Sequence, residues 1–334
     1  MSARILIVED APPNILALTT ILKDHGYQVS VATNGRQALE VLDRIRPDLI
    51  LLDVMMPEMD GFETCARIKT STQGREIPLI FLTSKNETAD IVRGFELGAV
   101  DYVAKPFNAH ELLARVHTHL TLDRLHRENE RLLLNVLPAS IAAKLKQQVG
   151  IIAEGFDDVS VLFTDIVGFT DLSEQLSPTA LIELLNRVFS SFDELAEQHG
   201  LEKIKTIGDA YMVAGGLPDP RPDHLESMAA FALAMEERVR ALNDDLNGLS
   251  LRVGLHTGHV IAGVIGIRKF IYDIWGDTVN TASRLESHGV PGRVHVSDTV
   301  FERLKDRFRF EPRGLIELKG RAPMQTYFLL PPAP

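Results

Sequence analysis

Five short apolar runs alternate with amphipathic stretches in the first 120 residues, and no other feature constrains the fold of this chain as strongly. The runs cover residues 5–8, 29–32, 49–52, 79–82 and 102–104. Short apolar runs separated by helical patterns are typical of parallel strands that are buried on both faces. The alternation therefore predicts an α/β fold in which helices cover both faces of a five-stranded, doubly wound parallel sheet.

Polar side chains follow these runs at the positions where the strands are expected to end. Glu9 and Asp10 follow the first run, Asp53 the third, Thr83 the fourth and Lys105 the fifth. The carboxyl ends of the strands form the active crevice of a doubly wound sheet, so these groups should meet there. Clustered carboxylates repel one another unless a cation lies among them, and oxygen ligands suit Mg²⁺. A carboxylate beside Mg²⁺ and an ammonium group can act as a nucleophile toward phosphorus.

The segment is similar to the receiver domain of two-component response regulators over essentially its whole length. The matching stretches read ILIVED, DLILLDVMMP and YVAKPF. The resemblance implies a flavodoxin-like fold in which Asp53 accepts a phosphoryl group from a cognate sensor histidine kinase or a phosphotransfer protein. It also implies that Glu9, Asp10 and Asp53 bind Mg²⁺ together with the backbone carbonyl of Met55. The alternative is a flavodoxin-like fold that is not phosphorylated.

The same resemblance implies a switch around the phosphorylation site. Thr83 and Lys105 would bind the oxygens of the phosphoryl group, and Tyr102 would change its orientation together with Thr83. The bond between Lys105 and Pro106 is expected to be cis, a conformation that X–Pro bonds adopt at modest cost. Phosphorylation would thereby alter the face of the domain that lies next to its last helix.

A helical pattern continues past the expected end of this domain, with no Gly or Pro between residues 110 and 130. Its apolar residues and one Asn are spaced three or four apart, at Leu122, Leu125, Asn129, Leu132 and Val136. These are alternating a and d positions of a coiled coil, and an Asn at an a position favours a parallel, in-register dimer. The pattern predicts a parallel homodimer; the alternative is an amphipathic helix that packs on its own domain.

From about residue 159 onward, strands and long helices mix in an α+β order. Asp165 ends an apolar strand in the run FTDIVGFT, and Asp209 occupies the turn of a predicted hairpin. Two Asp residues on adjacent strand ends can hold two Mg²⁺ ions, although either Asp alone could equally be a turn or cap residue. The turn formed by Gly168, Phe169 and Thr170 would offer backbone N–H groups to phosphate oxygens.

This second half resembles the class III nucleotide cyclases, which close a nucleoside triphosphate into a cyclic monophosphate. The resemblance covers about residues 158–330 and is most specific in the stretch FIYDIWGDTVNTASR. It implies a ferredoxin-like α+β domain in which Asp165 and Asp209 bind two Mg²⁺ or Mn²⁺ ions, assisted by the carbonyl of Ile166. A short helix predicted over residues 139–147 is similar to the transducer element that precedes many cyclase domains.

Two residues inside these motifs point to the base. Adenine presents a hydrogen-bond donor at N6 and an acceptor at N1, so a selective pocket needs a carboxylate and an ammonium group. Asp273 could supply the carboxylate and Lys205 the ammonium group. The related guanylate cyclases carry Glu at the position of Lys205 and usually Cys at that of Asp273. Outside these motifs, each residue would be an ordinary surface charge.

The resemblance also implies roles for the ribose and the phosphates. Asn280 would orient the ribose, and Arg284 would stabilise charge on the α-phosphoryl group as it becomes five-coordinate. Arg268 and Lys319 would hold the triphosphate. In this family each site lies between two chains, with the metal ligands on one and the base, ribose and transition-state groups on the other. This chain carries a full set, so a homodimer would hold two equivalent sites.

The composition limits the other possibilities. A formal net charge of −11 argues against binding to nucleic acid or to an anionic membrane. The single cysteine cannot form an internal disulfide, which fits a reducing cytoplasm. No apolar run approaches the length of a membrane span, and the first residues lead into a strand rather than a signal peptide. We therefore expect a cytoplasmic protein.

These features together predict a phosphorylation-regulated adenylate cyclase. Residues 1–120 would form the receiver, 121–157 a coiled-coil and transducer connector, and 158–330 the catalytic domain. The reaction would be in-line attack of the ribose 3′-oxygen of ATP on the α-phosphorus, which yields 3′,5′-cyclic AMP and pyrophosphate. One alternative is a guanylate cyclase. Another is a response regulator whose cyclase-like domain only binds a nucleotide or a partner.

Overall fold

The protein is described from a computed structural model, which covers residues 2–84, 88–147, 151–246, 249–266, 270–317 and 322–331. The chain forms two compact units, Met1–Leu132 and Leu133–Pro334. Each unit has its own sheet and its own apolar core. The two units are described in turn.

The first unit is built on a five-stranded parallel sheet, as the alternation of apolar runs predicts. Its strands are β1 (Arg4–Val8), β2 (Gln28–Ala32), β3 (Leu49–Asp53), β4 (Leu79–Thr83) and β5 (Asp101–Ala104). They are ordered β2-β1-β3-β4-β5, and every neighbouring pair is parallel. Because every pair is parallel, the carboxyl ends of β1, β3, β4 and β5 lie at one edge of the sheet, and the reversal of strand order between β1 and β3 places a crevice there.

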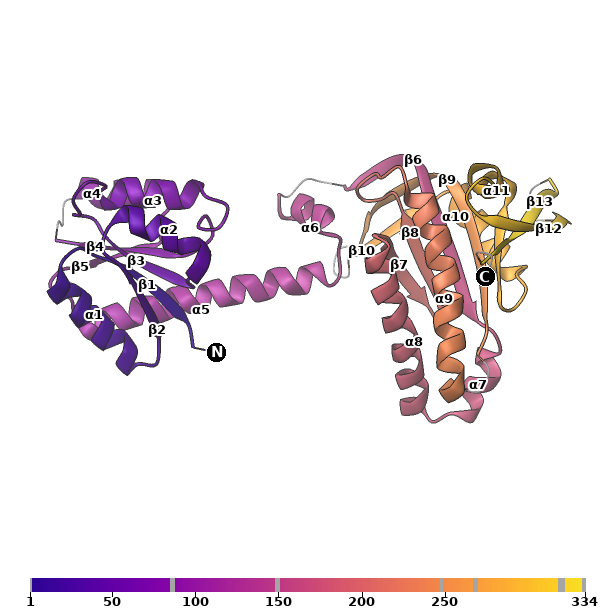
Figure 1. Cartoon of the computed structure of the whole chain (residues 1–334), viewed down its shortest axis with the longest axis horizontal. Helices are drawn as coiled ribbons and strands as arrows, with labels where there is room; N and C mark the ends of the chain where they lie inside the picture. The colour runs from indigo at the N-terminus through magenta and orange to yellow at the C-terminus, as the bar shows by residue number, and fades with distance from the viewer. Residues whose placement is uncertain are drawn as a thin grey trace. The chain divides into compact units, whose positions relative to one another are not determined.

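Helices cover both faces of this sheet (Figure 1). They are α1 (Pro12–Asp24), α2 (Gly35–Ile45), α3 (Gly61–Thr70), α4 (Thr88–Glu96) and α5 (Ala109–Leu134). Leu18 of α1 and Val116 of α5 share one buried cluster, whereas Leu42 of α2 and Ile68 of α3 belong to the cluster on the other face. This arrangement confirms the doubly wound architecture.

Helix α5 extends well beyond the receiver core and carries four of the five predicted a/d positions, but it ends at Leu134, before the predicted a position Val136. Leu122, Leu125 and Leu132 are each more than half exposed, and Val136, just after the helix, is 65% exposed. Asn129 is exposed as well. Because the described part of the chain does not bury these side chains, the alternative of a helix packed on its own domain finds no support here.

The second unit is built on a mixed eight-stranded sheet. Its strands are β6 (Ala153–Ile166), β7 (Glu202–Ile207), β8 (Ala210–Gly215), β9 (Leu251–Ile265), β10 (Ile271–Trp275), β11 (Arg293–Ser297), β12 (Arg309–Ile316) and β13 (Met324–Leu330). Their order is β12-β13-β11-β9-β6-β8-β7, and β10 pairs with β9. Among the strand pairs that the described residues form in this sheet, β9 and β11 pair in parallel and all others are antiparallel.

Two long helices lie side by side over one face of this sheet (Figure 1). The helices of this unit are α6 (Ala139–Lys146), α7 (Phe169–Gln175), α8 (Pro178–Gln198), α9 (His224–Leu246), α10 (Asp277–Ser287) and α11 (Asp298–Leu304). The long pair, α8 and α9, buries Phe192 and Phe231 against Tyr211 of β8. Ser177 caps α8 by accepting a hydrogen bond from the Ala180 N–H, as the sequence Ser-Pro predicts.

The predicted transducer helix packs into the second unit. Leu137, Ile141 and Ala142 are buried in a cluster that also holds Met212 and Tyr272. The connector expected over residues 121–157 is therefore divided between the two units. Across the residues that the structure describes, no helix combines the length and the apolar composition that crossing a membrane requires.

Candidate functional site

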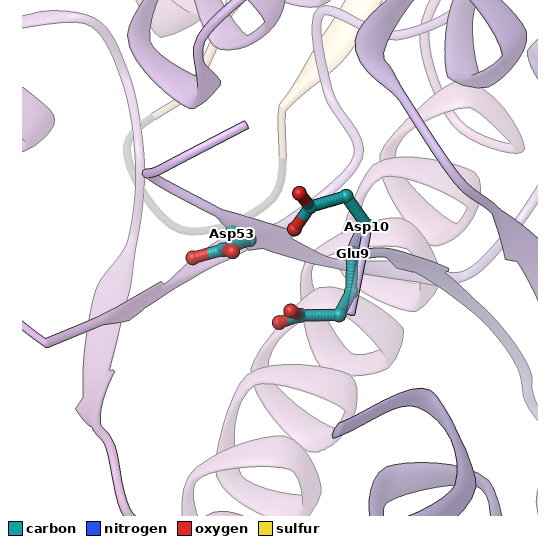
Figure 2. A group of neighbouring side chains, drawn as sticks. All are labelled: Glu9, Asp10 and Asp53. Atoms are coloured by element: carbon teal, nitrogen blue, oxygen red, sulfur yellow. The ribbon is translucent and has the colours of Figure 1, made fainter. Parts of the chain in front are cut away.

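Three carboxyl groups meet at the carboxyl edge of the receiver sheet (Figure 2). Glu9 and Asp10 follow β1, and Asp53 is the last residue of β3. One oxygen from each lies within 4.8 Å of the others, with Glu9 and Asp53 buried and Asp10 exposed. The strand ends thus bring together the three side chains that the sequence predicts. Their oxygen ligands, buried on one side and open on the other, fit a divalent cation.

Lys105 supplies positive charge to this cluster. Its Nζ lies 2.7 Å from Glu9 Oε2 and 2.9 Å from Asp53 Oδ2. Burial raises the pKa of Asp53, a hydrogen bond from Lys105 opposes that shift, and the charge of Glu9 adds to it. The Lys105–Pro106 bond is cis, as predicted. Three carboxyl groups against one ammonium group leave the cluster with excess negative charge even with Lys105 present.

The two predicted switch residues lie on the neighbouring strands. Thr83 ends β4 and is buried, and Tyr102 lies on β5. Both line a small cavity of about 20 Å³ next to α4, together with Phe95. Met55, whose carbonyl is the remaining predicted ligand, is held near the site because its N–H donates to Asp53 Oδ1 at 3.3 Å.

In the second unit, Asp165 lies near the end of β6 and is paired with a basic residue that sequence reasoning missed. Arg252 is its register partner on β9, and Arg252 Nε donates to Asp165 Oδ1 at 3.1 Å. The second guanidinium nitrogen contacts the other carboxylate oxygen. Asp209 occupies the turn between β7 and β8, and its charge also raises the pKa of Arg252, after those of Asp165 and Glu286. Both predicted metal ligands therefore lie within the electrostatic reach of Arg252.

Glu286 of α10 is the second missed residue. Its Oε1 lies 3.7 Å from Arg252 Nε, and its side chain is largely buried. Burial and the neighbouring Asp165 together raise the pKa of Glu286 to about 7, against the opposing effects of Ser287 and Arg252. Ile166, the remaining predicted contributor to the metal site, is buried at the end of β6. The one sequence signal for Arg252 is that it is the single Arg, Lys, Asp or Glu in the strand Leu251–Ile265.

The two predicted base-selecting residues are in contact. Lys205 of β7 and Asp273 of β10 are 68 residues apart, yet Lys205 Nζ lies 2.5 Å from Asp273 Oδ2. Their side chains are 34% and 14% exposed, so the pair lies at the surface but is partly shielded. The other oxygen of Asp273 accepts from the Ile274 N–H at 2.9 Å. The contact thus places an ammonium group on β7 next to a carboxylate on β10.

Helix α10 carries Asn280 and Arg284 on one face, since the two residues are four positions apart. Among the described residues, neither side chain makes a hydrogen bond or an ion pair. Gly168 precedes α7 with φ of +73°, and no side chain caps the first turn that Phe169 and Thr170 begin. The backbone N–H groups of this turn are therefore open to a ligand. The predicted phosphate-binding residues Arg268 and Lys319 lie outside the described residues.

Comparison with known families agrees with these geometries. The family described as "Adenylate and Guanylate cyclase catalytic domain" matches residues 151–331, and the "Response regulator receiver domain" matches residues 5–117. The first match covers more than half of the chain. The chain therefore belongs to the adenylate and guanylate cyclase catalytic domain family, and it carries a response regulator receiver domain ahead of that catalytic domain.

Individual relatives include both kinds of cyclase. The chain is 52% identical over 207 residues to "Adenylate cyclase" of Mycobacterium tuberculosis (strain ATCC 25618 / H37Rv), covering 61% of this chain and 47% of the relative. It is 41% identical over 223 residues to "Guanylate cyclase soluble subunit beta-2" of Homo sapiens, covering 66% and 36%. The chain thus spans less than half the length of these curated relatives.

Two solved structures are similar to the second unit. The adenylyl cyclase CyaB from P. aeruginosa matches with a TM-score of 0.53 and 30% identity, over 54% of this chain and 97% of that one. The guanylate cyclase domain of RhGC from Catenaria anguillulae, in complex with GTP, matches with a TM-score of 0.52 and 36% identity, over 53% and 98%. Both agree with an α+β cyclase fold for the second unit.

Proposed function

We propose that the chain is an adenylate cyclase that converts ATP to 3′,5′-cyclic AMP and pyrophosphate. The contact of 2.5 Å between Lys205 and Asp273 carries this proposal, because it joins the two groups that adenine requires. With ATP bound, Asp273 would accept from N6 and Lys205 would donate to N1. The identity of 52% to an adenylate cyclase supports this choice over the 41% to a guanylate cyclase subunit.

Asp165 and Asp209, with the carbonyl of Ile166, would hold two Mg²⁺ or Mn²⁺ ions. The residues fit such ions, because the Asp165 carboxylate lies beside a second carboxyl group, Glu286, and carboxylate oxygens suit these ions. When bound, the ions would polarise the ribose 3′-hydroxyl and compensate the charge of the leaving pyrophosphate. A cation that binds Asp165 must compete with Arg252, so that pair is expected to open during turnover.

The remaining residues would orient the nucleotide. Asn280 would position the ribose, and Arg284 would stabilise the charge on the α-phosphoryl group. The open first turn of α7 would donate backbone N–H groups to phosphate oxygens. Arg268 and Lys319 would hold the triphosphate. In-line attack of the 3′-oxygen on the α-phosphorus would then close the ring.

We also propose that the active form is a parallel homodimer. The exposed a/d positions of α5 would form its coiled coil. A second apolar face lies on the β9–β10 hairpin, where Ile261, Ile265, Ile271 and Trp275 are between 37% and 59% exposed. Ile271 is opposite Ile265 and Trp275 is opposite Ile261, so all four lie on one face of the hairpin. Such a face would be covered in a dimer, which could bring Asn280 and Arg284 of one chain to the carboxylates of the other.

Phosphorylation of Asp53 would regulate this enzyme. Glu9, Asp10 and Asp53, with the carbonyl of Met55, would hold Mg²⁺, and a sensor histidine kinase or phosphotransfer protein would donate the phosphoryl group. The phosphoryl oxygens would contact Thr83 and Lys105. Thr83 and Tyr102 line the same small cavity, so a movement of Thr83 would be felt at Tyr102. Since α5 follows β5, this change would reach the coiled-coil seam, and we expect activation.

The test is turnover of ATP and GTP, measured separately on the purified chain with Mg²⁺ or Mn²⁺. We expect cyclic AMP from ATP and much slower formation of cyclic GMP. A preference for GTP would replace the proposal with a guanylate cyclase. If a chain shown to be dimeric turns over neither nucleotide but binds one, the domain is a binding module rather than an enzyme.

A further inference from the structure

A cavity lies in the second unit, between helix α9 and the strands β11, β12 and β13. Its volume is about 860 Å³, which is within the range of small-molecule sites. The apolar part of its wall is formed by Leu233 and Ala234 of α9, Phe308 before β12, and Leu329 of β13. The cavity shares no residue with the nucleotide site described above.

Four arginines surround this apolar wall: Arg240, Arg293, Arg307 and Arg309. Arg293 pairs with Glu311 at 2.6 Å, and Arg307 pairs with Glu226 at 2.9 Å. Among the described residues, Arg240 and Arg309 make neither a hydrogen bond nor an ion pair. The same lining also holds Glu236 and Glu237, so four arginines against two carboxyl groups leave it with an excess of two formal positive charges, in a chain whose net charge is −11. Such a site attracts anions.

A buried carboxyl group also lines the cavity. Glu236 of α9 is only 4% exposed, and its Oε1 has no hydrogen-bond partner among the described residues. A buried polar atom without a partner is costly to keep, so its retention calls for an explanation. Burial raises the pKa of Glu236 to about 7, while Arg240 lowers it. Near neutral pH the group is therefore partly protonated and able to donate a hydrogen bond.

We infer that this cavity binds a small organic anion, namely a carboxylate or a phosphate monoester attached to an apolar body. The apolar body would lie on Leu233, Phe308 and Leu329. Arg240 and Arg309 would bind the anionic group through charge-assisted hydrogen bonds, which are stronger than neutral ones. Glu236 in its protonated form would donate to the same group, which would give the buried Oε1 a partner.

The cavity is connected to the catalytic carboxylates through the sheet. Arg293, at its edge, is the register partner of Arg252, and the Gly292 N–H donates to the Leu251 carbonyl at 2.8 Å. Arg252 in turn holds Asp165. A bound anion would therefore lie beside β11, with only β9 between that strand and the β6 that carries the predicted metal ligand Asp165. This position suits an effector.

The test is calorimetric titration of the full chain with octyl phosphate and octanoate. Octanol provides the same body without charge, and inorganic phosphate provides the charge without the body. We expect one octyl phosphate or octanoate to bind per chain, with both control compounds at least about tenfold weaker. Arg240→Ala combined with Arg309→Ala should weaken binding by about tenfold or more, because each lost charged hydrogen bond is worth roughly that factor.

Arg238→Ala is the matched control, since Arg238 is on the same helix but faces Glu194 at 3.5 Å and does not line the cavity. This variant should bind as the wild type does. The inference is wrong if neither octyl compound binds, or if the double variant binds them as tightly as Arg238→Ala does. Binding is the readout, so this outcome is independent of whether the chain turns over ATP.

Discussion

Exchanging the charges at the Lys205–Asp273 contact should convert the preference of the enzyme from ATP toward GTP. In Lys205→Glu with Asp273→Cys, adenine would meet a carboxylate at N1 and lose its acceptor at N6. Each mismatched hydrogen bond to a charged group costs about 1.5–3 kcal/mol, so two would change the ratio of rates by roughly 10²–10⁴. The side chain of Lys205 is 34% exposed, so solvent screens its share. We therefore expect a change of about 10² in the ratio of kcat/KM values.

The assay measures kcat/KM for both nucleotides by chromatographic separation of the cyclic products. Lys203→Glu is the matched control, because Lys203 lies on the same strand but pairs with Asp193 at 2.8 Å. That variant should retain the wild-type preference for ATP. An unchanged ATP preference in an active, dimeric Lys205→Glu/Asp273→Cys double variant would refute the assignment of the base-selecting pair.

Other variants test the remaining parts of the proposal. Asp209→Ala should abolish turnover. Mixing Asp209→Ala chains with Arg284→Ala chains should recover activity, since each heterodimer then holds one complete site. Inactive heterodimers would contradict a site shared between two chains. Asp53→Asn should remove any change in cyclase rate caused by beryllofluoride, and a persistent response would place the control elsewhere. Asn129→Leu should strengthen dimer association in sedimentation experiments but weaken the response of the cyclase rate to beryllofluoride, because Asn at an a position fixes register at a cost in stability. Unchanged association would argue against a coiled coil at these positions. Burial raises the pKa of Glu236 from 4.5 to about 7, so its stabilising contribution is complete below pH 4.5 and is lost as the pH rises to about 7. Glu236→Gln should remove this decrease in the free energy of unfolding, which is about 3 kcal/mol at most. Urea unfolding at pH 5 and pH 8 measures the decrease, and a Glu236→Gln variant that shows the same decrease as the wild type would refute the assignment to Glu236.

The sequence predicts that the receiver side chains meet, because strand ends determine their positions. Glu9, Asp53 and Lys105 each follow a strand of one parallel sheet, so the fold class alone places them at one edge. The proximity of Lys205 and Asp273 is different. They are 68 residues apart on strands that do not pair with each other, and only the family resemblance joined them.

The residues that sequence reasoning missed depend on tertiary contacts without a local pattern. Arg252 meets Asp165 because β9 and β6 pair in one register, and a shift of one residue would turn the guanidinium to the other face. Glu286 joins them only because α10 packs against β9. Arg240 and Arg309 are surface residues far apart in sequence. They line one cavity only because α9 lies beside the last strands of the sheet.

The two proposed metal sites share one physical device. In the receiver, Lys105 pairs with Glu9 and Asp53; in the catalytic unit, Arg252 pairs with Asp165 and lies beside Glu286. A basic side chain of the same unit thus holds each carboxylate cluster together, because like charges this close would otherwise repel. The same side chain competes with any divalent ion for the carboxylate oxygens. Each site should therefore bind its ion more weakly than the carboxylates alone would, and both phosphorylation and cyclisation should depend on the concentration of the free ion.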